Sequence, residues 1–168
     1  MWHFPIQLIN LGPTTDSMSF EKIDISKNVE IPTGNHVGAF GVERRHDYHK
    51  GVDLYCPEKT PVVAVEDGLI VHVRPFTGVD ADCPWWENTW SVSVSGVSGI
   101  VVYGEIVPYK KLLPEELMTR GVGKVLYEKE WVARFIRAGE LIGNVKRVLK
   151  KDKGRPTTML HLAMHTQG

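Results

Sequence analysis

Short apolar runs, rich in valine and isoleucine and closely spaced between turn-forming residues, are the feature that most constrains this chain. Its 168 residues include 16 glycines and 10 prolines, spread throughout the sequence. Side chains branched at Cβ favour strands, and frequent glycine and proline leave little room for long helices. A chain of this length can bury a sizeable core without a disulfide framework. The sequence therefore predicts one mainly β domain.

The individual strands are predicted from these runs. Val62 to Val65 and Leu69 to Val73 flank Glu-Asp-Gly, which predicts a hairpin with an Asp-Gly turn. One of the one or two short helices that we expect follows Pro114, because proline suits a first helical position and two glutamates come next. Residues 124–137 are ambiguous between helix and strand. Further strands are predicted at residues 90–94, 100–106 and 159–165.

Charge and hydropathy argue against two kinds of partner. The 20 basic side chains balance 20 acidic ones, and there is no long basic run, so we expect no nucleic-acid partner. No stretch approaches the roughly 18 apolar residues of a membrane-spanning helix. The N-terminal segment has no basic residue before its apolar stretch, and Pro5 interrupts it, so it does not resemble a secretion signal.

The two cysteines and three of the histidines indicate no site by themselves. Cys56 and Cys83 are too far apart in sequence for a redox or zinc motif, and they leave the redox state open. His3, His36 and His72 have no evident ligand partners nearby. We expect these three histidines to be structural or solvated.

Residues 44–53 read Arg-Arg-His-Asp-Tyr-His-Lys-Gly-Val-Asp and concentrate metal-binding side chains. In an extended chain the Cα atoms of His49 and Asp53 would lie about 13 Å apart, so a shared ion requires a bend, which Gly51 would permit. Imidazole and carboxylate ligands suit zinc, and a catalytic zinc takes three protein ligands and leaves a position for water. The alternative is a polar turn in which the His and Asp are incidental.

The predicted C-terminal strand, residues 159–165, contains two candidates for a third ligand. Side chains alternate along a strand, so His161 and His165 share the face opposite to the two leucines. Four residues of strand separate these histidines by about 13 Å, so both cannot easily reach one ion. The residues alone do not decide between them.

Together these motifs resemble the lysostaphin-type zinc endopeptidases, which cut peptide bonds in bacterial cell-wall peptidoglycan. Residues 49–53 match the family's His-x-x-x-Asp motif. Residues 59–68, Lys-Thr-Pro-Val-Val-Ala-Val-Glu-Asp-Gly, resemble its Gly-Thr-Pro-Val-x-Ala-x-x-Asp-Gly stretch, and residues 137–143 its glycine-containing turn. The resemblance implies a lysostaphin-like peptidase fold for residues 38–168. Residues 1–37 are less patterned, and we expect them to form an N-terminal arm packed on this domain.

The resemblance also implies the zinc ligands His49, Asp53 and His161, with two departures at the catalytic positions. The family's closing strand reads His-Leu-His, and Met159 stands at the first of these histidines. The family's other assisting histidine lies in a Tyr-x-His-Leu strand, and Glu105 occupies that position. Both usual catalytic histidines are therefore replaced.

Two functions follow from this pattern. In the first, the chain is a zinc metallopeptidase of peptidoglycan, in which zinc activates a water molecule and Glu105 is the general base. In the second, it is a non-catalytic zinc-binding module that recognises cell-wall peptide or a protein partner. We favour the peptidase, because a group capable of proton transfer replaces the histidine. Arg45 and His46 are candidate substrate-binding residues.

Four further expectations concern the location, the aromatic residues, the sheet and the core. Without a signal, a wall-cutting enzyme is expected in the cytoplasm or on a phage virion, with later access to the wall. The aromatic residues Trp85, Trp86 and Trp90 could line a substrate groove or pack in the core.

Because an ion must join the first third of the chain to its end, we expect an antiparallel sheet with the 62–73 hairpin beside strand 159–165. The predicted core residues are Val63, Val65, Val71, Ile100, Val102, Leu160 and Leu162.

Overall fold

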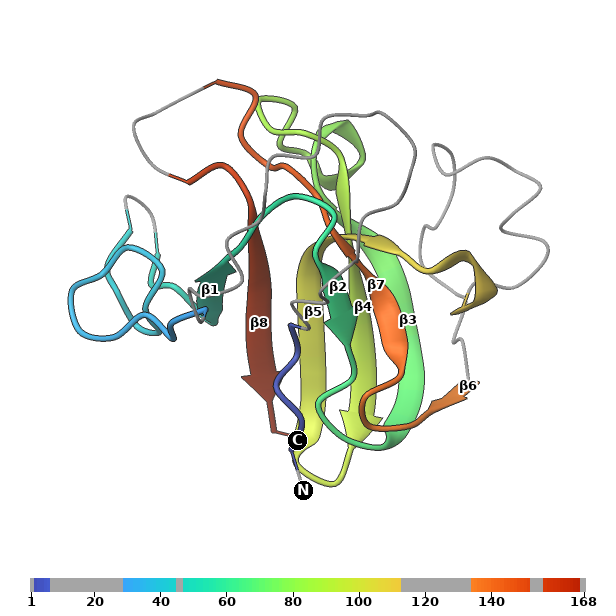
Figure 1. Cartoon of the computed structure of the whole chain (residues 1–168). Coiled ribbons are helices and arrows are strands. Elements are labelled where there is room, and N and C mark those ends of the chain that lie inside the picture. Colours follow the sequence, from blue (N-terminus) through green and yellow to red (C-terminus); the bar gives the residue numbers. More distant parts are fainter. Residues whose placement is uncertain (1, 7–28, 45–46, 113–133, 152–155, 167–168) are drawn as a thin grey trace, which may run out of the picture.

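The computed structural model describes residues 2–6, 29–44, 47–112, 134–151 and 156–166. Within them, eight strands form one antiparallel sheet, which confirms the mainly β, single-domain fold (Figure 1). Two short 3-10 helices, η1 (Val79–Ala81) and η2 (Lys110–Leu112), interrupt the strands. The strands are β1 (Val52–Tyr55), β2 (Pro61–Val63), β3 (Gly68–Thr77), β4 (Thr89–Gly96), β5 (Gly99–Pro108), β6 (Arg134–Ile136), β7 (Leu141–Val145) and β8 (Met159–His165).

The strand order places the two ends of the domain beside each other. The main path through the sheet runs β1, β8, β5, β4, β3 and β6, and β7 pairs with both β5 and β2. The last strand, β8, therefore lies between β1 and β5 (Figure 1). This pairing brings the His-x-x-x-Asp segment next to the C-terminal strand.

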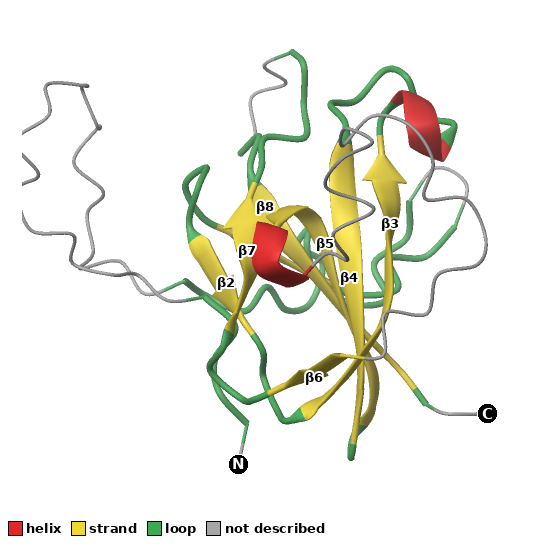
Figure 2. Ribbon diagram, turned by 90° about the vertical axis from the view of Figure 1, so that its right-hand side faces the viewer, coloured by secondary structure: helices red, strands yellow, loops and turns green. Residues whose placement is uncertain are grey.

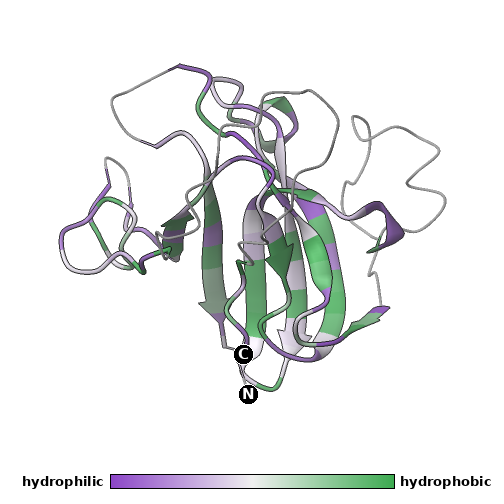
Figure 3. Ribbon diagram, in the orientation of Figure 1, coloured by the Kyte–Doolittle hydropathy of each residue, from purple (hydrophilic) through white to green (hydrophobic). Residues whose placement is uncertain are grey.

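The hydrophobic core lies on one side of this sheet. Side chains of β4 alternate, with Trp90, Val92 and Val94 in the core and serines on the other face. Strands β2 and β7 lie in front of the main sheet in Figure 1 and to its left in Figure 2, and they supply Val62 and Val145 to the same core. Figure 3 shows the resulting hydrophobic bands along the central strands, and more polar loops around β1.

The predicted 62–73 hairpin is wrong. Strand β2 pairs with β7, whereas β3 pairs with β4 and β6, and neither β2 nor β3 pairs with β8. The segment between β2 and β3 forms backbone hydrogen bonds with the 138–140 turn. Ala64 N donates to Glu140 O, and Gly139 N donates to Ala64 O. A short apolar run predicts a strand, but its partner depends on contacts far along the chain.

Irregular strand pairing also changed which side chains face the core. The register of β3 against β4 shifts between Ile70 and His72, so the expected alternation is broken there. On β5 the core face carries Val101 and Tyr103, and Ile100 is only half-buried, contrary to its prediction as a core residue. Five of the other predicted core residues, Val63, Val65, Val71, Val102 and Leu160, are buried, and Leu162 is half-buried against the core.

The N-terminal residues that the structure describes pack along β2. His3 N donates to Val65 O, and Val63 N donates to Pro5 O. The Trp2 indole donates to the buried carboxylate of Glu66. The division into an arm (residues 1–37) and a domain (residues 38–168) stays a prediction.

Three other expectations can be compared with the described residues only in part. The helix after Pro114 lies outside them. Cys56 is buried and Cys83 is half-buried, and both thiols are free. No helix in the described part of the chain is long and apolar enough to cross a membrane.

Candidate metal centre

Three predicted ligands meet on the sheet face opposite to the core. Asp53 on β1 and His161 on β8 are directly paired, and His49 lies just before β1. The distance from His49 Nε2 to Asp53 Oδ1 is 3.0 Å, and that from His161 Nδ1 to Asp53 Oδ1 is 2.9 Å. The two imidazole nitrogens are 3.1 Å apart. We call these three residues the His-Asp-His cluster.

The tautomer of His49 is set by the backbone behind it. His49 is 4% exposed, and its Nδ1 lies 2.9 Å from the carbonyl oxygen of Ala39. A carbonyl can only accept, so Nδ1 carries the proton and donates. In the neutral ring, Nε2 then presents a lone pair to the cluster, which is the usual arrangement for a histidine that binds a metal.

Gly51 positions His161 by its small size. A Cβ atom at Gly51 would lie 2.6 Å from the Leu162 carbonyl oxygen and 2.8 Å from two atoms of the His161 ring. The expected bend at Gly51 is present, but it does not use a positive φ. Glycine is needed here because the histidine ring and the Leu162 carbonyl pack against its backbone.

Asp53 uses its two oxygens for different partners. Oδ1 faces the two histidines, and Oδ2 accepts a 2.7 Å hydrogen bond from Arg44 Nη2. Burial alone would raise the pKa of Asp53, but interactions with His161, His49 and Arg44 outweigh it and hold that pKa below its usual value. The pKa of His49 is lowered mainly by burial, although the charge of Asp53 opposes this effect.

The donor set and its spacing fit a small divalent cation. Each residue offers one ligand atom, and these atoms lie within 4.8 Å of one another. Their separations of 2.9–3.1 Å are close to the roughly 3.3 Å expected between two ligands of a tetrahedral ion with bonds of about 2.05 Å. The His-Asp-His cluster could therefore bind a metal ion.

Glu105, the sequence-predicted base, is buried without a hydrogen-bond partner for one oxygen. The residue is 8% exposed, and its Oε2 has no partner among the described residues. Burial raises the pKa of Glu105 well above its usual range, the charge of Asp53 raises it further, and Arg44 opposes both. Glu105 is thus shielded from solvent and forms no salt bridge with another described residue.

The backbone around Glu105 is irregular. Ser91 on β4 stands opposite two residues of β5, Gly104 and Glu105, because the register shifts between Trp90 and Val92. Glu105 has a φ of 65°, a conformation that is uncommon for a residue with a side chain. Such strained positions occur often at functional sites.

Apolar groups complete the surroundings of His161. Phe76 lies with its ring centroid 5.3 Å from that of His161. Gly104, paired with His161 across the sheet, leaves room for the Phe76 ring, since a Cβ there would lie 2.6 Å from it. Met159, which replaces the family's first histidine, is buried on the same face as His161.

The remaining candidates are placed as follows. Arg45 and His46 lie outside the described residues, so their substrate-binding role stays a prediction. His165 is exposed and is not part of the cluster. Trp90 packs in the core, whereas Trp85 is 64% exposed.

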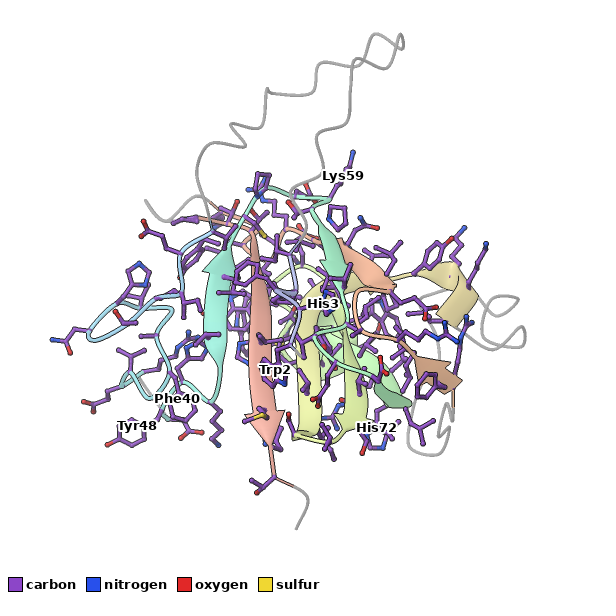
Figure 4. The ribbon with its side chains drawn as sticks, turned by 60° about the horizontal axis from the view of Figure 1, so that its bottom comes forward. Trp2, His3, Phe40, Tyr48, Lys59 and His72 are labelled. Carbon is purple, nitrogen blue, oxygen red and sulfur yellow. The ribbon has the colours of Figure 1, made fainter. Side chains whose placement is uncertain are left out.

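Sequence reasoning missed the contacts that hold the ligands. Arg44 was visible only as one of two adjacent arginines, and nothing in the sequence distinguishes it as the partner of Asp53. The Ala39 carbonyl that orients His49 carries no side-chain signal at all. Both contacts come from the loop before β1, on which Figure 4 labels Phe40 and Tyr48 at one side of the molecule, away from His72.

No family model matches this chain, and no curated protein matches it closely. It is similar to solved structures of Helicobacter pylori Csd3. The structure from the hexagonal crystal has a TM-score of 0.44 and 17% identity, over 96% of this chain and 29% of that chain. The structure from the orthorhombic crystal has a TM-score of 0.40 and 18% identity, over 81% of this chain and 29% of that chain. The chain thus spans less than a third of those chains, and the likeness is too distant to assign a family or an activity.

Proposed function

We propose that this chain is a zinc metallopeptidase that hydrolyses peptide bonds of bacterial peptidoglycan. The observation that carries the proposal is the convergence of His49 Nε2, Asp53 Oδ1 and His161 Nδ1 within 4.8 Å of one another, with the buried Glu105 near enough for the charge of Asp53 to raise its pKa. Its substrate class rests on the sequence motifs that resemble the lysostaphin-type endopeptidases. Access to the wall from the cytoplasm or from a virion is part of the same proposal.

Zinc is the proposed ion because of the ligand types. Two imidazoles and one carboxylate form a three-ligand set that is typical of catalytic zinc, in which a fourth position stays open. When bound, zinc would lower the pKa of a coordinated water and polarise the scissile carbonyl. The residues of the chain fix the geometry, since the Ala39 carbonyl and Arg44 orient two of the three ligands.

Glu105 is the proposed general base and then acid. Its carboxyl accepts the proton of the attacking water and passes it to the leaving amine. In the protein without metal, burial favours the neutral acid, which cannot accept this proton. A cation at the His-Asp-His cluster favours the ionised carboxylate, so metal binding and activation of the base are coupled.

The competing function is a zinc-binding module that recognises cell-wall peptide without cutting it. One experiment separates the two. Zinc-loaded wild-type protein and its Glu105→Gln variant are incubated with purified peptidoglycan, and released amino groups and peptides are measured by mass spectrometry. A peptidase releases peptides and loses about 10² to 10⁴ in rate with the variant. Zinc-loaded protein that sediments with the wall but releases no peptide favours the binding module.

A further inference from the structure

Arg44 stands beside the His-Asp-His cluster but is only partly engaged by the protein. Its Nη2 donates to Asp53 Oδ2 at 2.7 Å and to the Val37 carbonyl oxygen at 3.1 Å. Its side chain nevertheless remains 43% exposed, whereas that of Asp53 is 6% exposed. The arginine is therefore fixed at one nitrogen and open to solvent over much of its remaining surface.

The unused donors of Arg44 form an anion-binding group. A guanidinium has five N–H groups, and the two contacts with described residues both use Nη2. Two N–H groups on Nη1 and one on Nε are left, and charge-assisted hydrogen bonds from such groups to a carboxylate are among the stronger ones in proteins. Because Asp53 and Val37 hold the guanidinium in place, little additional ordering is needed when an anion binds.

The surrounding charges favour an anionic ligand once a cation is present. A divalent ion, Asp53 and Arg44 have formal charges of +2, −1 and +1, so the site stays positive even if Glu105 is ionised. The charge of Arg44 also acts on His49 and Glu105, and its guanidinium donates to Asp53. Arg44 is thus close to two of the three proposed ligands and to the proposed base.

We propose that Arg44 is a substrate-binding residue that holds a peptide carboxylate beside the metal, so that the site favours peptides with a free carboxylate near the scissile bond. The inference rests on the proposed peptidase function and specifies its substrate. The carboxylate can be the C-terminal group of the peptide or an acidic side chain close to it. Both supply the same chemistry to the guanidinium.

The test compares binding of matched peptides to zinc-saturated protein by calorimetry. The probes are acetylated Lys-D-Ala-D-Ala as the free acid, the same peptide as its C-terminal amide, and an amide whose last residue is glutamate. We expect the free acid to bind roughly tenfold or more tightly than the plain amide, as one charge-assisted hydrogen bond suggests. The glutamate peptide shows whether a side-chain carboxylate replaces the terminal one.

Substitutions of Arg44, compared with a substitution of a control arginine, show whether Arg44 holds the carboxylate. At equal zinc loading, Arg44→Gln is expected to lower the affinity for the acid to that for the amide. Arg44→Lys, which keeps the charge beside Asp53 but lacks the fork of donors, should lose part of the preference and serves if the glutamine variant is unstable. Arg134→Gln is the matched control. The side chain of Arg134 is 44% exposed and lies near Glu140, and its strand, β6, is at the opposite edge of the sheet from β1. This variant should keep the full preference. Zinc content is measured for every variant, so that all comparisons are made at equal loading.

The outcomes separate this inference from the peptidase proposal. Equal affinity of wild-type protein for the acid and the amides, or no binding of any, overturns the role of Arg44 whether or not peptidoglycan is cut. A preference that survives in Arg44→Gln means that the ion itself holds the carboxylate, which also overturns it. A preference that Arg44 controls, in a protein that releases nothing from peptidoglycan, supports the role of Arg44 and contradicts the peptidase.

Discussion

His161 on β8 stands directly opposite Asp53 on β1, and the histidine Nδ1 lies 2.9 Å from the carboxylate Oδ1. The two residues are 108 positions apart in the sequence. Strand pairing therefore places these two candidate ligands side by side. The candidate metal centre thus depends on the hydrogen bonds that join the first and last described strands of the sheet.

The first prediction concerns the third ligand. His161→Ala removes one of three donor atoms, so the purified protein should contain well below one equivalent of zinc by elemental analysis. His165→Ala is the matched control, because His165 is on the same strand four residues later but exposed and outside the cluster. It should keep a full equivalent. Full zinc in His161→Ala would show that this histidine is not a ligand.

The second prediction is that metal removal destabilises the domain. An ion that binds only the folded chain, at 100 times its dissociation constant, adds about 2.7 kcal/mol to the free energy of unfolding. For a chain of this size the midpoint of thermal unfolding should fall by roughly 5 to 10 °C when a chelator removes zinc. Differential scanning calorimetry measures the change, and His161→Ala should show no response to the chelator.

The third prediction is that Glu105→Gln stabilises the metal-free protein. The raised pKa of Glu105 in the folded state means that, above the unfolded value of about 4.3, the unfolded chain releases a proton that the folded chain keeps. Wild-type stability therefore falls as the pH rises from that value towards the folded pKa. Glutamine does not titrate, so its advantage should be absent at pH 4 and grow as the pH rises towards pH 7. Urea unfolding at both pH values measures it.

Glu66 supplies the matched control for that substitution. It is also a buried glutamate, at 6% exposure, but its carboxylate accepts hydrogen bonds from Trp2 Nε1 and from the Ser98 backbone and hydroxyl. Glu66→Gln places an amide donor against these donors and should destabilise the protein by about 1 kcal/mol. If both variants change stability in the same direction, the unpartnered state of Glu105 is not the cause.

The fourth prediction concerns Gly51. In Gly51→Ala the new Cβ would lie 2.6 Å from the Leu162 carbonyl oxygen and 2.8 Å from two atoms of the His161 ring, so the ring must shift from its position in the cluster. We expect a loss of about 1 to 3 kcal/mol in the free energy of unfolding, typical of an overpacked site, together with weakened zinc binding. Chemical denaturation and zinc titration with a competing chelator measure the two effects.

Gly143→Ala is the control that separates a general loss of stability by overpacking from displacement of the ligand His161. Gly143 lies on β7, and a Cβ there would clash with the carbonyl oxygen of Val107 on the neighbouring strand β5. Neither residue belongs to the His-Asp-His cluster. This variant should lose stability to a similar extent while its folded fraction binds zinc as tightly as wild type. Unaltered zinc affinity in Gly51→Ala would contradict the role assigned to this glycine.

The local sequence pattern determined the fold class and pointed to the ligand types. Alternating apolar residues such as Trp90, Val92 and Val94 predict a strand from local spacing alone, and the strand lies where it was expected. The His-x-x-x-Asp spacing and the single histidine between leucines are likewise local signals. They pointed to His49, Asp53 and either His161 or His165, and the resemblance to the lysostaphin-type endopeptidases selected His161, which the structure brings together with the other two.

Only the tertiary structure decided strand partners, core faces and the surroundings of the ligands. The partner of β2 depends on the 138–140 turn, and bulges at Ile70 and Glu105 shift the alternation that would place neighbouring side chains, Ile100 among them. The tie between Arg44 and Asp53, the lack of space at Gly51 and the burial of Glu105 all arise from segments that meet only after folding. Sequence periodicity reports which faces of an element are apolar, whereas pairing and burial depend on contacts between residues far apart in the chain, which no local pattern encodes.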